Sequence, residues 1–269
     1  MSSTSLLPLE TIETIIDALA ADDIQSVSSC ARVCHAFLPL SRKHIFASII
    51  LNDNSSQTPS PTARMLERLL STTPEIAIHI RSLTYCIDVE DFKNKPFQDT
   101  LEKITRLQSL HVWYYNRVKF DWKRNPLRTA LLHLLHLPTL THLKLFAIDN
   151  FAASDLIPCL NLKELDLENV AAAHPDEEIP TTFPDRSPRL SKFSAGIRSN
   201  TVTTQLCRRQ RPDGKPLVDF AGVTKISFKY LKTECVEASR EVLRHCGQLV
   251  SIYIHGTSLL RCIEIETSA

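Results

Sequence analysis

The sequence has 269 residues, which is room for one large domain or two ordinary ones. Its 31 Lys and Arg nearly balance its 30 Asp and Glu, so no overall electric field draws the chain to nucleic acid or to an anionic membrane. Only five glycines are present, none before residue 196. This excludes the glycine-rich phosphate loops of nucleotide enzymes and the nucleophile elbow of the α/β-hydrolases.

The N-terminal segment and the cysteines bear on the compartment. The chain starts with a short polar run that has no basic region, and no later segment approaches the roughly 20 apolar residues of a membrane span. The eight cysteines are scattered, with no Cys-x-x-Cys pair. We therefore expect an intracellular protein, in the cytoplasm or the nucleus, with reduced cysteines.

Residues 1–51 are rich in helix signals. Pro8 suits a first helical turn, and Asp22 or Asp23 is placed to cap a second helix, while a third short segment follows Pro39. The apolar positions of the first helix follow helical spacing at Ile12, Ile15, Ile16 and Leu19. A helical unit of this size buries little surface by itself, so we expect it to pack on a partner.

The same residues carry a resemblance to a known family. The motif consists of Leu7-Pro8-Leu9-Glu10, the isoleucines of the first helix, Asp22-Asp23-Ile24, Arg32-Val33-Cys34 and the later Phe37, Leu40, Ile45 and Phe46. Over about residues 6–50 this pattern resembles an F-box. Thr11 and Phe37 depart mildly from it, because the family often has an aliphatic residue and Trp there.

The resemblance implies docking, by helix packing and without catalysis, onto the Skp-family adaptor of an SCF-type ubiquitin ligase, and through it onto a cullin. The adaptor-binding residues would be Leu7, Pro8, Leu9, Ile12, Ile15, Ile16, Leu19, Val33 and Phe37. The alternative is that the same apolar stripe is buried within the chain, as a helical cap on the region C-terminal to it.

A polar linker, residues 52–61, separates this unit from a region with an internal repeat. The repeated pattern is apolar-x-x-apolar-x-apolar, and its central residues are spaced 22 to 33 positions apart. These seven anchors are Leu83, Leu110, Leu143, Leu165, Phe193, Ile226 and Ile252. Helical spacing between anchors predicts helices over 100–107, 127–137, 155–160 and 236–243, and alternation of strand and helix predicts a parallel sheet.

The repeat resembles the leucine-rich repeat, although Ile148 and Val170 occupy the position where that family usually has Asn. F-box proteins with leucine-rich repeats have the same order of parts. We therefore expect an α+β protein with an all-α F-box (1–51), a linker (52–61) and an irregular solenoid (62–269). The solenoid would have about seven repeats, parallel strands, helices on its convex side and a C-terminal hairpin cap. A doubly wound α/β domain is disfavoured because glycines are missing at the strand ends.

Side chains that alternate with the buried strand residues should form a concave binding surface. The residues we predict to bind a target there are His111, Trp113, Lys144, Phe146, Asp166, Glu168 and Tyr253, with the aromatic residues as anchors. The alternative is that the charges form cross-strand pairs, Lys144 with Asp166, and Glu164 with His142 and Lys192.

Other clusters give weaker signals. His133, His136 and His142 have no acidic or cysteine ligand beside them, so we expect no metal site. The basic cluster of Arg208, Arg209, Arg211 and Lys215 is either a nuclear or phosphate-binding signal or a solvated loop, and residues 176–178 form an acidic counterpart.

No catalytic or cofactor motif is present. Together with this absence, the resemblance to F-box proteins with leucine-rich repeats implies a non-enzymatic substrate receptor of an SCF-type ligase that needs no cofactor. The alternative is a leucine-rich-repeat scaffold or regulator that never joins a ligase.

Overall fold

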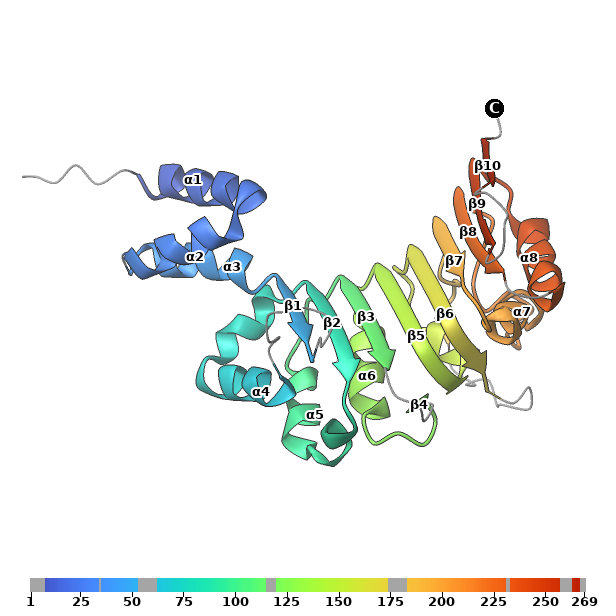
Figure 1. Ribbon diagram of the computed structural model, residues 1–269, viewed down its shortest axis with the longest axis horizontal. Helices are drawn as coiled ribbons and strands as arrows, with labels where there is room; N and C mark the ends of the chain where they lie inside the picture. The colour runs from blue at the N-terminus through green and yellow to red at the C-terminus, as the bar shows by residue number, and fades with distance from the viewer. Residues whose placement is uncertain are drawn as a thin grey trace, which may run out of the picture.

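The computed structural model describes residues 8–33, 35–52, 62–114, 120–173, 183–230, 233–256 and 263–266. It is a mixed α and β structure in which three N-terminal helices precede one long curved sheet (Figure 1). The three helices are α1 (Leu9–Asp22), α2 (Ile24–Val33) and α3 (Phe37–Ile45). Asp23, one of the two predicted caps, starts α2 by accepting the backbone N–H groups of Gln25 and Ser26 at 2.8 and 3.2 Å.

The strands pair in chain order. They are β1 (Ser48–Leu51), β2 (Ser82–Ile87), β3 (Ser109–Tyr114), β5 (His142–Phe151), β6 (Glu164–Ala172), β7 (Lys192–Ala195), β8 (Lys225–Tyr230), β9 (Ser251–Gly256) and β10 (Ile263–Glu266), with β4 (Phe120–Asp121) beside the end of β5. Neighbours are parallel except β10, which runs antiparallel to β9 as the expected hairpin requires. The order never reverses, unlike that of a doubly wound sheet.

The register confirms the sequence repeat. All seven anchors lie opposite one another on successive strands, in the order Leu83, Leu110, Leu143, Leu165, Phe193, Ile226 and Ile252, and all except the half-buried Ile252 are buried. The row also extends to Ile49 of β1, which pairs with Leu83. Residues 48–51, which the sequence placed with the helical unit, therefore supply the first strand of the sheet.

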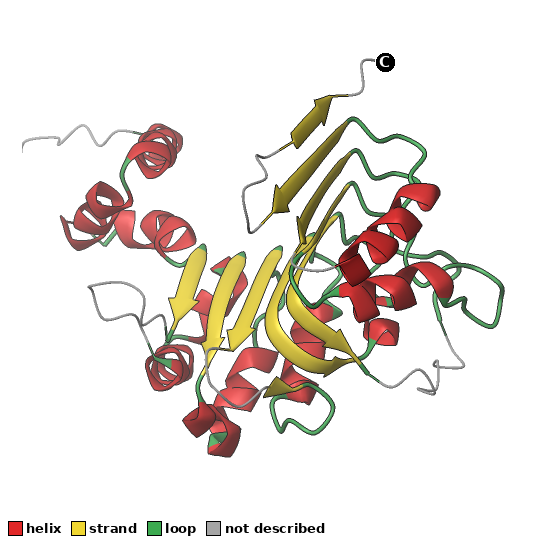
Figure 2. Cartoon of the chain, turned by 45° about the vertical axis from the view of Figure 1, so that its right-hand side comes forward, coloured by secondary structure: helices red, strands yellow, loops and turns green. Residues whose placement is uncertain are grey.

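Helices cover one side of the sheet, and the other side carries none in the part of the chain that is described (Figures 1 and 2). The covering elements are α4 (Ala63–Thr72), α5 (Lys95–Glu102), α6 (Arg128–Leu135), α7 (Asn200–Arg208), α8 (Thr233–His245) and the short 3₁₀ helices η1 (Pro74–His79), η2 (Val89–Lys93) and η3 (Ala153–Leu156). We call the helix-free side the open face. The helices predicted over 127–137 and 236–243 correspond to α6 and α8.

Two helix predictions were wrong in position or type. The helix expected over 100–107 starts earlier, because Asn94 caps α5 by accepting the N–H of Phe97 at 3.3 Å, and it ends at Glu102. Ile104 and Leu107 enter the core from an irregular segment instead. The segment 155–160 forms only the end of η3 and turns.

A left-handed residue interrupts the alternation of side chains within β5 and within β6. Ala147 and Asn169, which lie between paired residues of these strands, both have left-handed φ, at 57° and 56°. Side chains of a strand normally alternate between its two faces, and each left-handed residue inserts one extra position into that pattern. Ile148 and Val170 therefore point to the buried face and are fully buried.

Candidate protein-interaction surfaces

The N-terminal helical unit has a very small interior. Among the described residues of 8–46, only Ile16, Val27 and Ser41 are buried. Four large apolar side chains on α1 and α2 are instead exposed, Leu9 (57%), Ile15 (46%), Ile24 (47%) and Val33 (75%). Exposed large apolar side chains on two adjacent helices are available for packing against another protein.

The predicted adaptor-binding residues divide according to exposure. Pro8, Leu9, Ile15 and Val33 are exposed, Ile12, Leu19 and Phe37 are half-buried, and Leu7 lies outside the described residues. Ile16 is buried inside the unit, where it packs and offers no surface. Ile24, which the predicted set omits, is exposed as well. It belongs to the motif quoted from the sequence and follows the Asp23 cap, so it could have been included.

Ion pairs hold α3 against α1. The Lys43 ammonium lies 2.7 Å from Glu13 and 2.8 Å from Asp17, and His44 Nε2 lies 2.7 Å from the same Asp17 carboxylate. The hydrogen bond from Lys43 is the main cause that lowers the pKa of Asp17, and the same bond raises the pKa of Lys43. These ion pairs thus help to orient α1 and α3, which share few buried apolar contacts.

The open face carries the predicted target-binding residues. His111, Lys144 and Asp166 lie opposite one another on β3, β5 and β6, and Trp113, Phe146 and Glu168 form the next row. These six side chains are half-buried and adjacent. Tyr253 faces the same side on β9 but is separated from them by Ser194 and Ser227, so the structure does not bring it together with the others.

The charged part of this face pairs with itself, as the alternative interpretation predicted. Lys144 Nζ lies 3.4 Å from Asp166, and Glu164 lies 3.4 Å from His142 and 3.1 Å from Lys192. Lys229 and Glu168 make a further pair at 2.7 Å. All of these side chains except Glu168 border a hollow of about 450 Å³. Partly exposed pairs of this kind stabilise the fold by about 1 kcal/mol or less each.

The aromatic part lies beside it. The rings of His111 and Trp113 are 5.8 Å apart, and burial, followed by the Lys144 charge, lowers the pKa of His111. The Trp113 indole nitrogen is covered, yet it has no hydrogen-bond acceptor among the described residues. A buried donor without an acceptor costs about 1–3 kcal/mol.

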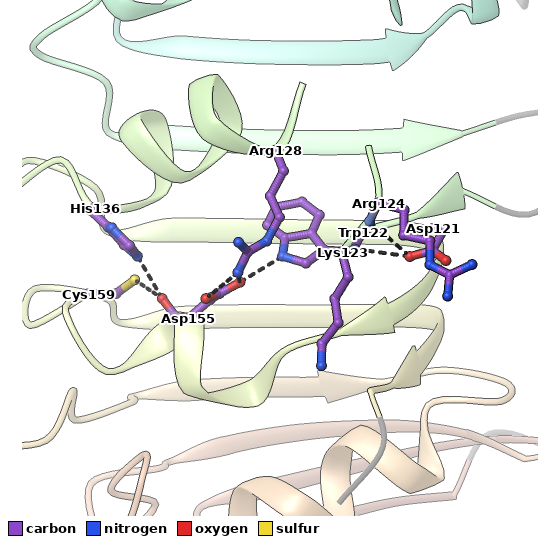
Figure 3. A network of polar contacts seen from close by, with 8 residues as sticks. All are labelled: Asp121, Trp122, Lys123, Arg124, Arg128, His136, Asp155 and Cys159. Carbon is purple, nitrogen blue, oxygen red and sulfur yellow. Dashed lines mark hydrogen bonds and ion pairs between the residues drawn. The ribbon is translucent and has the colours of Figure 1, made fainter. Parts of the chain in front are cut away.

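A polar network on the helix side is structural (Figure 3). The Asp155 carboxylate accepts hydrogen bonds from Trp122 Nε1 at 2.7 Å and from Arg128 at 3.1 Å. The Asp155 carbonyl lies 2.9 Å from His136 Nε2. The network therefore joins η3 to α6 and to the segment after β4.

The three histidines weighed as a metal site do not converge. His133 bonds the Ile104 carbonyl, His136 the Asp155 carbonyl, and His142 contacts Glu164. Within the described ranges no group of three or more His, Cys, Asp or Glu side chains is placed to hold a metal.

Burial raises the pKa of Cys207 to about 12, so that cysteine is a thiol rather than a nucleophilic thiolate at neutral pH.

Three members of the basic cluster of 208–215 each contact an acidic side chain. Arg211 is buried, where it bonds Asp213 and stacks 4.7 Å from the centre of the Phe183 ring. Arg208 lies 3.6 Å from Glu241, and Lys215 lies 3.7 Å from Asp213. Arg211 thus stabilises a loop and is not available to an anion. The acidic counterpart, 176–178, lies outside the described residues.

Comparison with models of known protein families finds no match, and a search of curated proteins finds none either. None of the helices described for this chain has the length and apolarity needed to cross a bilayer.

Proposed function

We propose that this protein is a non-catalytic substrate receptor of an SCF-type ubiquitin ligase. The N-terminal helices would dock the Skp-family adaptor, and the open face of the sheet, as an irregular leucine-rich-repeat surface, would hold a target protein. The observation that carries the proposal is the set of exposed apolar side chains Leu9, Ile15, Ile24 and Val33 on α1 and α2.

These side chains support docking because water is their alternative environment. Fully burying a Val, Leu or Ile side chain contributes about 1.5–3 kcal/mol, and this unit leaves four of them largely outside its own interior. They lie on the helices whose sequence resembles an F-box. A helical partner that covered them would supply the core that the unit lacks.

The second candidate function is a repeat scaffold whose N-terminal helices only cap the sheet. The contacts between the two regions favour it. Arg42 of α3 lies 3.1 Å from Glu75 of η1, and the Ala47 carbonyl accepts the N–H groups of Arg81 and Ser82. The cap interpretation leaves the exposed apolar residues without a role, so we rank it second.

The test is calorimetric titration of the full chain with a purified Skp-family adaptor. Leu9→Asp and Val33→Asp each place a charge among the exposed apolar side chains of α1 and α2, and we expect each to weaken binding at least about tenfold, which corresponds to about 1.4 kcal/mol. Met65→Asp on α4 is the matched control, because Met65 is 59% exposed and Leu9 is 57% exposed. Circular dichroism checks that each variant is folded.

Two results would contradict the receptor proposal. One is the absence of binding by the folded wild-type chain, which would leave the scaffold function. The other is equal weakening by Leu9→Asp and Met65→Asp, which would mean that the adaptor does not bind specifically at the exposed apolar side chains of α1 and α2.

A further inference from the structure

The open face has two parts with different chemistry. In the charged part, on β5 to β8, each of the three β6 carboxylates already lies within 3.4 Å of a cation. A charged ligand would have to break one of these pairs before it formed another. Lys225, exposed at the edge of this part, has no ion pair among the described residues, but a single solvated ammonium is strongly screened.

The other part, which we call the aromatic zone, has no formal charge. It is made of Ile50, Thr84, Cys86, His111, Trp113 and Phe146, which lie side by side on β1, β2, β3 and β5. Burial, followed by the Lys144 charge, lowers the pKa of His111, which favours its neutral form. Ile50, at the end nearest the N-terminal helices, is 45% exposed. The zone therefore fits an uncharged, apolar surface better than an acidic or basic one.

Trp113 gives the aromatic zone one hydrogen-bond donor, its indole N–H. Its ring is only partly exposed, and its indole N–H is covered and lacks an acceptor within the described chain. Trp122, the other tryptophan, is buried and donates to Asp155. A bound segment that offered a carbonyl oxygen would satisfy the Trp113 donor once the ring turned toward it, and that gain would add to the burial of apolar surface.

We propose that the aromatic zone binds a neutral peptide segment of a target protein, with an aromatic or branched aliphatic side chain packed on Trp113 and Phe146 and a backbone carbonyl accepting the indole N–H. This inference rests on the proposed function, in which the open face receives the target. It names the chemistry of that target, which is unmodified and apolar, without phosphate or an acidic cluster.

Selection from a displayed library of random dodecapeptides tests the proposal. The full chain is the bait, and the selected peptides are measured against Trp113→Ser and against Lys225→Ser, which removes the exposed lysine of the charged part. We expect the enriched peptides to be uncharged and rich in Phe, Leu, Ile and Val. We expect Trp113→Ser to weaken them at least tenfold, and Lys225→Ser to weaken them less than twofold. A parallel array of phosphoserine peptides should give no binding above that of its unphosphorylated twin.

An NMR titration supplies an independent signal, because the chain has only two tryptophans and therefore two indole N–H resonances. The Trp113 resonance should move downfield with the enriched peptide while that of Trp122 stays in place. Enrichment of charged or phosphorylated peptides, failure to enrich any peptide, or binding insensitive to Trp113→Ser would overturn the proposal.

The adaptor titration separates this proposal from the proposed function. Trp113→Ser should bind the adaptor as tightly as the wild type, since Trp113 lies on β3 and the exposed apolar side chains proposed to bind the adaptor lie on α1 and α2. If the adaptor binds but the peptides are charged, the inference about the target fails alone. If apolar peptides bind but the adaptor does not, the receptor function fails and the aromatic zone belongs to a scaffold.

Discussion

The N-terminal helices and the sheet contain the same types of apolar residue, but the sheet buries them and the helices leave several exposed. In the sheet, Leu143 and its neighbours form a continuous buried row, because each strand lies between two others and under a helix. In the N-terminal unit, α1 and α2 pack mainly on each other and on the short α3, and Leu9 and Val33 are left in water. Burial therefore depends on how many elements surround a residue, rather than on its type.

A matched pair of side-chain truncations, one in each region, tests this comparison most strongly. Leu143→Ala and Leu9→Ala remove the same atoms, but Leu143 is in the core and Leu9 is on the surface. We expect Leu143→Ala to lower the free energy of unfolding by about 2–5 kcal/mol and Leu9→Ala to change it by no more than about 0.5 kcal/mol. Urea unfolding of both variants measures the difference. Similar losses would mean that the helical unit has a core of its own.

A smaller effect is expected from the polar network behind the sheet. Asp155→Ala removes the acceptor of the buried Trp122 indole N–H and of Arg128, and we expect a loss of about 1–3 kcal/mol in unfolding free energy. The control is Asp99→Ala, because Asp99 is exposed on α5. Equal stability of the two variants in urea would show that the network does not join η3 to α6.

The smallest expected effect is a pH dependence at the start of the sheet. Asp91 is buried and accepts hydrogen bonds from Tyr85 at 2.7 Å and from Asn52 at 2.9 Å, and burial raises its pKa above the ordinary value. The folded state therefore holds the Asp91 proton more tightly than the unfolded chain does. Its contribution to stability is present below about pH 4 and is lost as the pH rises through the folded pKa.

Asp91→Asn keeps an oxygen acceptor for Tyr85 but does not titrate. We expect the stability of this variant, relative to the wild type, to increase as the pH rises from about 4 toward neutrality. Urea midpoints at a series of pH values measure that difference. A constant difference would show that folding does not change the pKa of Asp91, and a difference that decreases with pH would show that folding favours the carboxylate.

Much of the sheet could be predicted from the sequence because its signal is local and repeated. The spacing of Leu83, Leu110 and the later anchors gave the strands, their order and their register, since a parallel sheet places equivalent repeat positions side by side. The pairs of Lys144 with Asp166 and of Glu164 with Lys192 followed from the same register. By contrast, β1 lacked the repeat pattern and was assigned to the preceding unit.

The sequence by itself determined which residues could be apolar neighbours, because strand alternation and helix spacing are properties of the local backbone. Only the tertiary structure decided which of those residues are covered. It buried Ile16, exposed Ile24, turned Ile148 inward through a left-handed residue, and left the Trp113 N–H without an acceptor among the described residues. These outcomes depend on contacts between segments far apart in the chain, and the spacing of residues along one segment does not contain them.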